Sequence, residues 1–153
     1  MHALELKIPP VVLVVIFALA MWLLAQVLPP LTFPARWALV LAGIFVISGI
    51  AVALSGVLAF RRADTTVDPR VPQQTSSLVI KGIYRYSRNP MYLGFLLLLT
   101  ALACYLMSVA AFALLPLFVL YMNRWQIIPE ERYLLQKFGA DYQAYKAQVR
   151  RWF

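Results

Sequence analysis

The chain has 153 residues, enough for one domain over 1–153, and 63% of them are hydrophobic against 13% charged. Because soluble domains are on average about half apolar and about a quarter charged, this composition indicates an integral membrane protein. The single cysteine, Cys104, lies in an apolar run and the single histidine, His2, lies at the N-terminus. These placements exclude a disulfide framework, a Ser-His-Asp triad and a zinc or haem site, and we expect no metal.

Two apolar stretches near the N-terminus are each long enough to cross a bilayer, which takes about 20 residues of helix. The first covers 9–28 and has proline pairs at both ends. A cleaved signal peptide is the alternative for it, although no small-x-small cleavage site follows. The second covers 36–60. It contains small residues that would let another helix approach closely, at Gly43, Gly49, Ser55 and Gly56.

A polar connector follows over 61–88, and its final part crowds charge and aromatic rings. We predict an ordered loop, because a long structureless loop is unusual in so small a domain; a plain cytoplasmic linker is the alternative. Cations and tyrosines gather between residues 78 and 94, at Lys81, Tyr84, Arg85, Tyr86, Arg88 and Tyr92. Such a cluster at the mouth of a membrane segment is costly and seldom idle.

Residues 91–123 carry no charge. One helix of that length would be about 50 Å long, against a hydrocarbon core of about 30 Å. We therefore predict a helical hairpin with arms at about 90–106 and 109–127 that turns near Met107 and Ser108. Pro90 suits the first turn of the first arm, because its missing N–H costs nothing there.

From Pro129 onward the chain is amphipathic. Apolar residues recur at intervals of three or four, at Leu134, Phe138, Tyr142, Tyr145, Val149 and Trp152. This spacing predicts helices over 129–151 that lie in the membrane interface, with a break at Gly139. Pro129, Glu130 and Glu131 suit a helix N-terminus, where acidic side chains complement the helix dipole.

The expected fold is an all-α integral membrane protein with four transmembrane helices, a helical hairpin over about 90–127 and a C-terminal amphipathic interfacial helical segment. Four spans place both termini on one side of the membrane, and every Lys and Arg except Arg36 lies on that side. The positive-inside bias therefore predicts cytoplasmic termini, in what we expect to be a bacterial inner membrane.

The cytoplasmic side also carries the 77–94 cluster and the pair Glu130-Glu131, which the hairpin brings together. Acidic groups beside cations and tyrosines are suited to a zwitterionic, ribose-bearing ligand. The alternative is that the acidic pair only complements a helix dipole, worth about 0.3–1 kcal/mol. Arg85 and Arg88 would then only contact lipid phosphates.

Several blocks in this region resemble a known signature. They are, in chain order, Gly82-Ile83-Tyr84, Arg88-Asn89-Pro90-Met91-Tyr92-Leu93-Gly94, Glu130-Glu131 and Phe138-Gly139-Ala140-Asp141-Tyr142. They are similar to the pattern of the isoprenylcysteine carboxyl methyltransferase and phospholipid methyltransferase family, integral membrane enzymes that use S-adenosylmethionine. The resemblance covers about residues 60–150.

The resemblance implies a cofactor site and a substrate site. Cofactor contacts are implied for Ser76, Ser77, Leu78, Val79, Tyr84, Asn89, Pro90, Met91, Tyr92 and Glu130. Arg88, Tyr92 and Arg124 become candidate catalytic residues, and Arg124 and Gln126 become candidate substrate-binding residues. Two positions depart from the pattern. Asn89 stands where many members have histidine, and Gln126 stands where the prenylcysteine enzymes have an arginine that holds the substrate carboxylate, with Arg124 the nearest cation.

The implied activity is transfer of a methyl group from S-adenosylmethionine to a lipophilic acceptor that arrives from the bilayer. The expected partners are a lipid or lipophilic small molecule and the membrane, and no nucleic acid. The alternatives are a protein-S-isoprenylcysteine carboxyl O-methyltransferase proper, an NADPH-dependent membrane reductase, and a non-catalytic membrane protein. The departure at Gln126 disfavours a carboxylate acceptor. A thiol, an amine or a phospholipid stays open, as does the oligomeric state.

Overall fold

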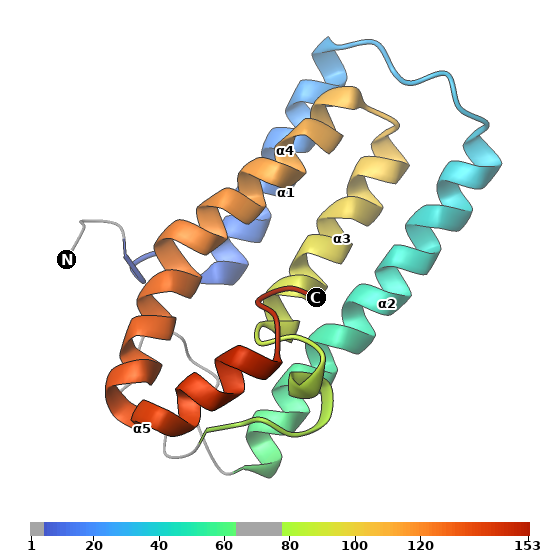
Figure 1. Cartoon of the computed structure of the whole chain (residues 1–153). Helices are drawn as coiled ribbons and strands as arrows, with labels where there is room; N and C mark the ends of the chain where they lie inside the picture. The colour runs from blue at the N-terminus through green and yellow to red at the C-terminus, as the bar shows by residue number, and fades with distance from the viewer. Residues whose placement is uncertain (1–4, 64–77) are drawn as a thin grey trace.

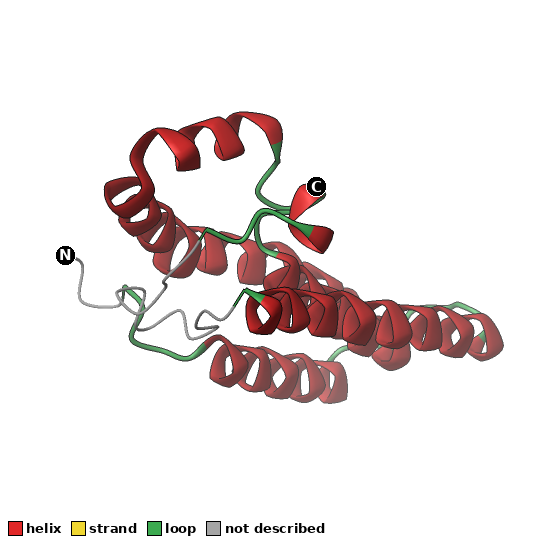
Figure 2. Cartoon of the chain, turned by 90° about the horizontal axis from the view of Figure 1, so that it is seen from below, coloured by secondary structure: helices red, strands yellow, loops and turns green. Residues whose placement is uncertain are grey.

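The computed structural model describes residues 5–63 and 78–153, and all regular structure in these two ranges is helical (Figures 1 and 2). The elements are α1 (Pro10–Val27), α2 (Ala35–Arg62), the 3-10 turn η2 (Gly82–Arg85), α3 (Pro90–Leu106), α4 (Val109–Tyr121), the π-helix η3 (Met122–Ile127) and α5 (Ile128–Gln148). The predicted helices at 9–28, 36–60 and 90–106 agree with α1, α2 and α3 to within two residues. The predicted helix at 109–127 corresponds to α4 and η3 together, and it continues into α5 without a break.

Long apolar helices make this an integral membrane protein. Three helices are long and apolar enough to cross a membrane, namely α1, α2 and the continuous helix Val109–Gln148. The helix α3 is also apolar but shorter, at 17 residues. Large apolar side chains stand exposed along α1 and α2, and Ile47, for example, is 73% exposed. Lipid tails, unlike water, accept such surfaces without cost.

The helix α3 lies at the centre of the bundle, with α2 on one side and α1 and α4 on the other (Figure 1). Glycines let α2 approach it closely. A Cβ placed on Gly94 would lie 2.7 Å from the Cβ of Ala53, and one on Gly56 would lie 2.8 Å from the Cγ of Met91. The predicted close approach along the second span is therefore confirmed at Gly56 and at Gly49, where an added Cβ would meet the Gly94 carbonyl oxygen at 3.0 Å.

The hairpin turns where the sequence predicted. Met107 adopts a left-handed conformation, with φ 48° and ψ 41°, and closes α3. Ser108 is extended and precedes α4. The connector between α1 and α2 is tied to the same turn, because the Leu31 N–H donates to the Met107 carbonyl. At the opposite end, α5 crosses the bundle, and the C-terminus lies beside the start of α3 (Figure 1).

The helix α5 begins at Ile128 and has Pro129 in its first turn, close to the predicted start. It has no free N-terminus, however, because α4 continues through η3 into it. The backbone of Ile127 is helical, and the Ile128 N–H donates to the Asn123 carbonyl, a π-helical bond. Since Pro129 has no N–H, the Trp125 carbonyl four residues earlier accepts instead from the Leu6 N–H at 3.1 Å. The predicted helix-dipole role of Glu130 and Glu131 loses its basis here.

The apolar face of α5 packs against the protein. Gly139, with φ 50° and ψ −120°, kinks the helix where the sequence predicted a break. Beyond it Tyr142 and Tyr145 are buried together with Val79 and Tyr84. The residues of the predicted face that pack against this cluster are Leu134, Phe138 and Val149. The helix ends at Gln148, three residues before the predicted 151, and Trp152 packs against a different core cluster, formed by α1, α3, α4 and η3.

Candidate functional site

Tyr92 and Glu130, far apart in sequence, meet where α5 crosses the start of α3. Tyr92 lies in the first turn of α3 and is 5% exposed. Its hydroxyl donates a hydrogen bond to Oε1 of Glu130, in the first turn of α5. Burial raises the pKa of Glu130 to about 8, and the charge of Glu131 adds to this while the bond from Tyr92 opposes it. The result is a carboxyl that gains and loses its proton near neutral pH.

Tyr84 is held beside this pair by the 3-10 turn η2. Its ring packs edge-to-face on Phe60, with the ring centroids 5.4 Å apart, and its carbonyl accepts from the Tyr145 hydroxyl at 2.7 Å. Burial, then Tyr145 and Glu130, raise the pKa of the Tyr84 phenol well above its usual range. Glu130 is thus close enough to Tyr84 for its charge to be felt, and the fold gathers three of the predicted site residues in one region.

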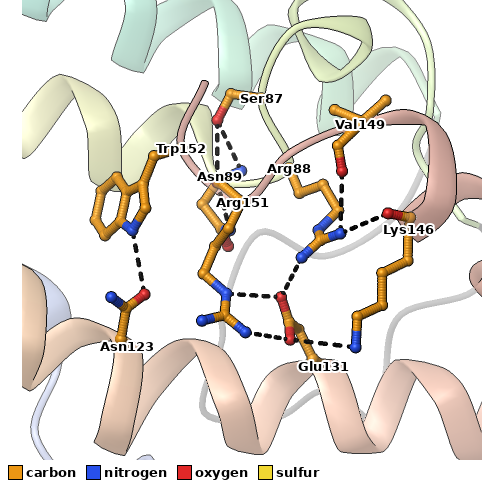
Figure 3. A network of polar contacts seen from close by, with 9 residues as sticks. All are labelled: Ser87, Arg88, Asn89, Asn123, Glu131, Lys146, Val149, Arg151 and Trp152. Carbon is orange, nitrogen blue, oxygen red and sulfur yellow. Dashed lines mark hydrogen bonds and ion pairs between the residues drawn. The ribbon is translucent and has the colours of Figure 1, made fainter.

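Glu131 has the opposite environment from its neighbour (Figure 3). Arg88 Nη2 donates to its Oε1 at 2.7 Å, and Arg151 binds both oxygens, at 3.0 Å through Nε and 2.8 Å through Nη2. Lys146 Nζ lies 3.9 Å from Oε2. Burial alone would raise the pKa of Glu131, but the bonds and charges of Arg151 and Arg88 outweigh it and hold this pKa below its usual range. Glu131 is therefore a permanent anion between two guanidinium groups.

The remaining polar groups before α3 are bound to the end of the chain. Arg88 Nη1 donates to the carbonyls of Lys146 and Val149, each at 3.0 Å. Asn89 Nδ2 donates to the Arg151 carbonyl at 3.0 Å (Figure 3). These contacts bind both terminal nitrogens of Arg88 and the amide nitrogen of Asn89 within the protein, while the buried Nε of Arg88 has no hydrogen-bond partner among the described residues. The sequence predicted a cofactor contact for Asn89 and a catalytic role for Arg88, and the structure uses both to bind the C-terminal residues.

The other predicted cofactor residues within the described ranges pack against α2 or around Tyr84. Pro90 is buried beside Gly56, and Met91 lies against the same glycine. Val79 is buried in the cluster that holds Tyr84, and Leu78 packs against it. The predicted contacts at Ser76 and Ser77 lie outside the described residues.

Gln126 and Arg124, the predicted substrate residues, point to different partners. Gln126 is fully buried in η3, and its Nε2 donates to the Ile8 carbonyl at 2.6 Å. Its Oε1 is buried and has no hydrogen-bond partner among the described residues. The Arg124 side chain is 39% exposed and lies 3.4 Å from Glu5. The two side chains therefore bind different partners, and their role toward a substrate stays a prediction.

Residues that sequence reasoning missed complete the arrangement. Arg151 binds Glu131, and Trp152 Nε1 donates to Oδ1 of Asn123 in η3 at 3.1 Å. Glu5 joins Arg124 and Arg132. A buried carboxylate requires partners. The sequence offers three cations in its last eight residues as possible partners for Glu131, namely Lys146, Arg150 and Arg151. Which of them would reach it depends on how α5 ends.

The fold and site define a small helical membrane protein with a tyrosine–glutamate pair held at one end of its bundle. A model of the phospholipid methyltransferase family matches residues 37–141, which is more than half of the chain. The chain belongs to this family and is a membrane methyltransferase, as the resemblance of the sequence blocks indicated.

Two further comparisons place the chain among known proteins. It is 45% identical over 62 residues to an uncharacterized protein of Haemophilus influenzae. The aligned residues cover 40% of this chain and 98% of that protein. No solved structure matches the chain.

Proposed function

We propose that this protein transfers a methyl group from S-adenosylmethionine to a lipophilic acceptor that reaches the site from the bilayer. The observation that carries the proposal is the partly buried contact between Tyr92 and Glu130 at the start of the central helix. It joins two blocks of the family pattern, one at the start of α3 and one at the start of α5.

The groups around this contact fit such a donor. S-adenosylmethionine carries a positively charged ammonium, ribose hydroxyls and a sulfonium that makes its methyl group electrophilic. Burial penalises the charge of Glu130, so an ammonium beside it would stabilise the ionised form. The carboxylate of Glu130 also accepts from hydroxyl groups. Tyr84 and Tyr92 offer aromatic faces to a purine or a cation.

In the reaction that we propose, a lone pair of the acceptor forms a bond to the methyl carbon while the electrons of the carbon–sulfur bond return to sulfur. The chain's residues act mainly by holding the two reactants in line, which is worth about 7–11 kcal/mol in well-oriented systems. A protonated amine would first have to lose a proton. The ionised carboxylate of Glu130 is a candidate to accept it.

The environment of Gln126 supports an acceptor that is not a carboxylate. One N–H of its amide donates to Ile8, and its carbonyl oxygen Oε1, which has no partner among the described residues, accepts hydrogen bonds and repels an anion. A buried carboxylate needs a paired cation or several donors. A lipophilic amine, a thiol or a phospholipid head group does not need such a cation for its reacting atom. These acceptors therefore fit the site better than the carboxylate that an isoprenylcysteine carboxyl methyltransferase would methylate.

Binding of radiolabelled S-adenosylmethionine to the purified protein tests the proposal. We expect binding to the natural chain and at least tenfold weaker binding to Glu130→Gln, because loss of one hydrogen bond to a charged group costs about 1.5–3 kcal/mol. Asp141→Asn is the matched control, since it makes the same chemical change at an exposed position of the same helix. Binding of NADPH instead would indicate a reductase, and binding of neither would indicate a non-catalytic protein.

The acceptor is identified by offering lipid extracts and a prenylcysteine analogue side by side with labelled donor. Transfer to the lipid fraction supports the proposal. Efficient formation of a base-labile methyl ester on the prenylcysteine analogue would contradict the argument from Gln126.

A further inference from the structure

The last five residues, 149–153, form a C-terminal segment that leaves α5 and returns to the start of α3 (Figure 1). They lie beyond residues 37–141, which the family model matches. The Arg88 N–H donates to the Arg150 carbonyl at 3.0 Å, and the Arg151 carbonyl accepts from Asn89 Nδ2 at 3.0 Å and from the Ser87 hydroxyl at 3.4 Å. Backbone pairing thus fixes the C-terminal segment against the residues that precede α3.

The side chains of the C-terminal segment reach two other elements (Figure 3). Arg151 extends to Glu131 at the start of α5 and forms a bidentate pair with it. Trp152 donates to Asn123 in η3 and packs against the core cluster that contains Tyr92. The segment therefore joins the start of α3, the π-helix and the start of α5, which are the three elements around the candidate site.

The geometry links this junction to the Tyr92–Glu130 contact. Arg88, which binds Glu131 from the other side, lies just before α3 and four residues before Tyr92. Glu131 is the immediate neighbour of Glu130. The side chains of Arg88 and Glu131 are only 8% and 10% exposed, so this is a buried ion pair, with Nη2 and Oε1 2.7 Å apart. The Arg88–Glu131 contact and the Tyr92–Glu130 contact therefore join the same two segments, the start of α3 and the start of α5.

We propose that the C-terminal segment is part of the functional site and that Arg151 is a positioning residue, which holds Glu131 against Arg88 and thereby sets the contact between Tyr92 and Glu130. Two guanidinium groups clamp one carboxylate, and removal of Arg151 leaves a buried anion with Arg88 as its close partner. The consequence for methyl-donor binding rests on the function proposed above, whereas the consequence for the Tyr92–Glu130 contact does not.

The test compares two neighbouring arginines in the full-length protein, purified in lipid nanodiscs. Arg151→Ala removes the clamp. Arg150→Ala makes the same change of charge and size, but the Arg150 residue is exposed and contributes its carbonyl to the contacts described here. By calorimetry with S-adenosylmethionine, we expect Arg150→Ala to bind within twofold of the natural chain and Arg151→Ala to bind at least tenfold more weakly. Arg151→Lys should fall between them, because an ammonium cannot reproduce a bidentate fork.

A second measurement needs no ligand. Infrared titration of the Glu130 carboxyl, assigned by its absence in Glu130→Gln, should give a midpoint near 8 in the natural chain and in Arg150→Ala. In Arg151→Ala the midpoint should fall toward the ordinary value, because hydration of Glu130 removes the burial that is the largest cause of its raised pKa, and this outweighs the loss of the Tyr92 bond, which lowers the pKa. If Arg151→Ala does not fold, Arg151→Lys provides the same comparison with a smaller shift.

The two measurements separate the possible failures. If the natural chain does not bind S-adenosylmethionine, the proposed function fails and the titration alone decides the role of Arg151. If Arg151→Ala both titrates and binds as Arg150→Ala does, the C-terminal segment is packing without a positioning role, and the inference is overturned.

Discussion

At the residue scale, Glu130 and Glu131 are adjacent in sequence and yet differ in protonation. Burial next to a neutral phenol raises the pKa of Glu130 to about 8, whereas two guanidinium groups hold the pKa of Glu131 below its usual range. Neighbouring carboxyl groups with such different pKa values are typical of sites in which one group handles a proton and the other organises the structure.

The raised pKa of Glu130 predicts a pH-dependent stability. The ordinary pKa is 4.5 and the folded value is about 8, so between these values the folded state keeps a proton that the unfolded state has lost. The contribution of Glu130 is therefore full below about pH 4.5 and is lost as the pH rises through about 8. Unfolding temperatures of the natural chain and of Glu130→Gln, measured in detergent across this range, should show the natural chain losing stability relative to the variant. Parallel curves would contradict the assigned pKa.

At the element scale, the close packing of α2 on α3 depends on Gly94. Its missing side chain leaves room for Ala53 and for the Gly49 carbonyl, both of which would lie 2.7 Å from an added Cβ. The neighbours include backbone, which cannot turn away as a flexible side chain would. The helices α2 and α3 can therefore pack closely because Gly94 has no side chain.

Gly94→Ala should therefore destabilise the protein by about 1–3 kcal/mol, the usual cost of overpacking. Gly43→Ala is the control, because nothing lies within 4 Å of the added Cβ and alanine is the better residue inside a helix. Unfolding temperatures in one detergent should fall for Gly94→Ala and stay level or rise for Gly43→Ala. An equal response at both positions would show that the α2–α3 contact is looser than the structure describes.

The π-helix η3 is the second element that decides the site. It lets α4 run into α5 without a break while Pro129 leaves the Trp125 carbonyl to Leu6. It also directs Gln126 toward Ile8 and Arg124 toward Glu5. A regular α-helix through these residues would place the same side chains on different faces, so this segment explains why the two predicted substrate residues have separate partners.

At the scale of the whole molecule, the first and last described residues lie on the side of the bundle where α5 lies. The α1–α2 connector lies at the opposite end (Figure 1). We expect the α5 end to face the cytoplasm, because every Lys and Arg except Arg36 belongs to segments at that end or to the connector leading to it. Reporter fusions at the C-terminus and within 29–34 should then report opposite sides of the membrane. A C-terminal reporter outside the cytoplasm would reject this orientation.

The sequence by itself determined the class of protein and the bounds of its apolar helices. Uninterrupted apolar runs can be satisfied in a bilayer only as helices, so 9–28, 36–60 and 90–106 needed no knowledge of their neighbours. The blocks around Tyr92 and Glu130 likewise identified the family. These conclusions rest on composition, local spacing and motif order, which do not change with tertiary contacts.

Only the tertiary structure decided which polar groups meet. Arg88 had several possible partners in the sequence, and its pairing with Glu131 depends on how α5 crosses the start of α3. Arg151, at the end of the chain, carries no local pattern that marks it as a partner of Glu131. Gln126 was identified as a departure from a motif, but the bond to Ile8 that uses its amide N–H₂ group required the N-terminal segment to lie against η3. Each of these contacts joins residues more than 15 positions apart in the sequence. The chemistry of a side chain indicates what kind of partner it needs, but the tertiary fold determines which residue lies close enough to be that partner.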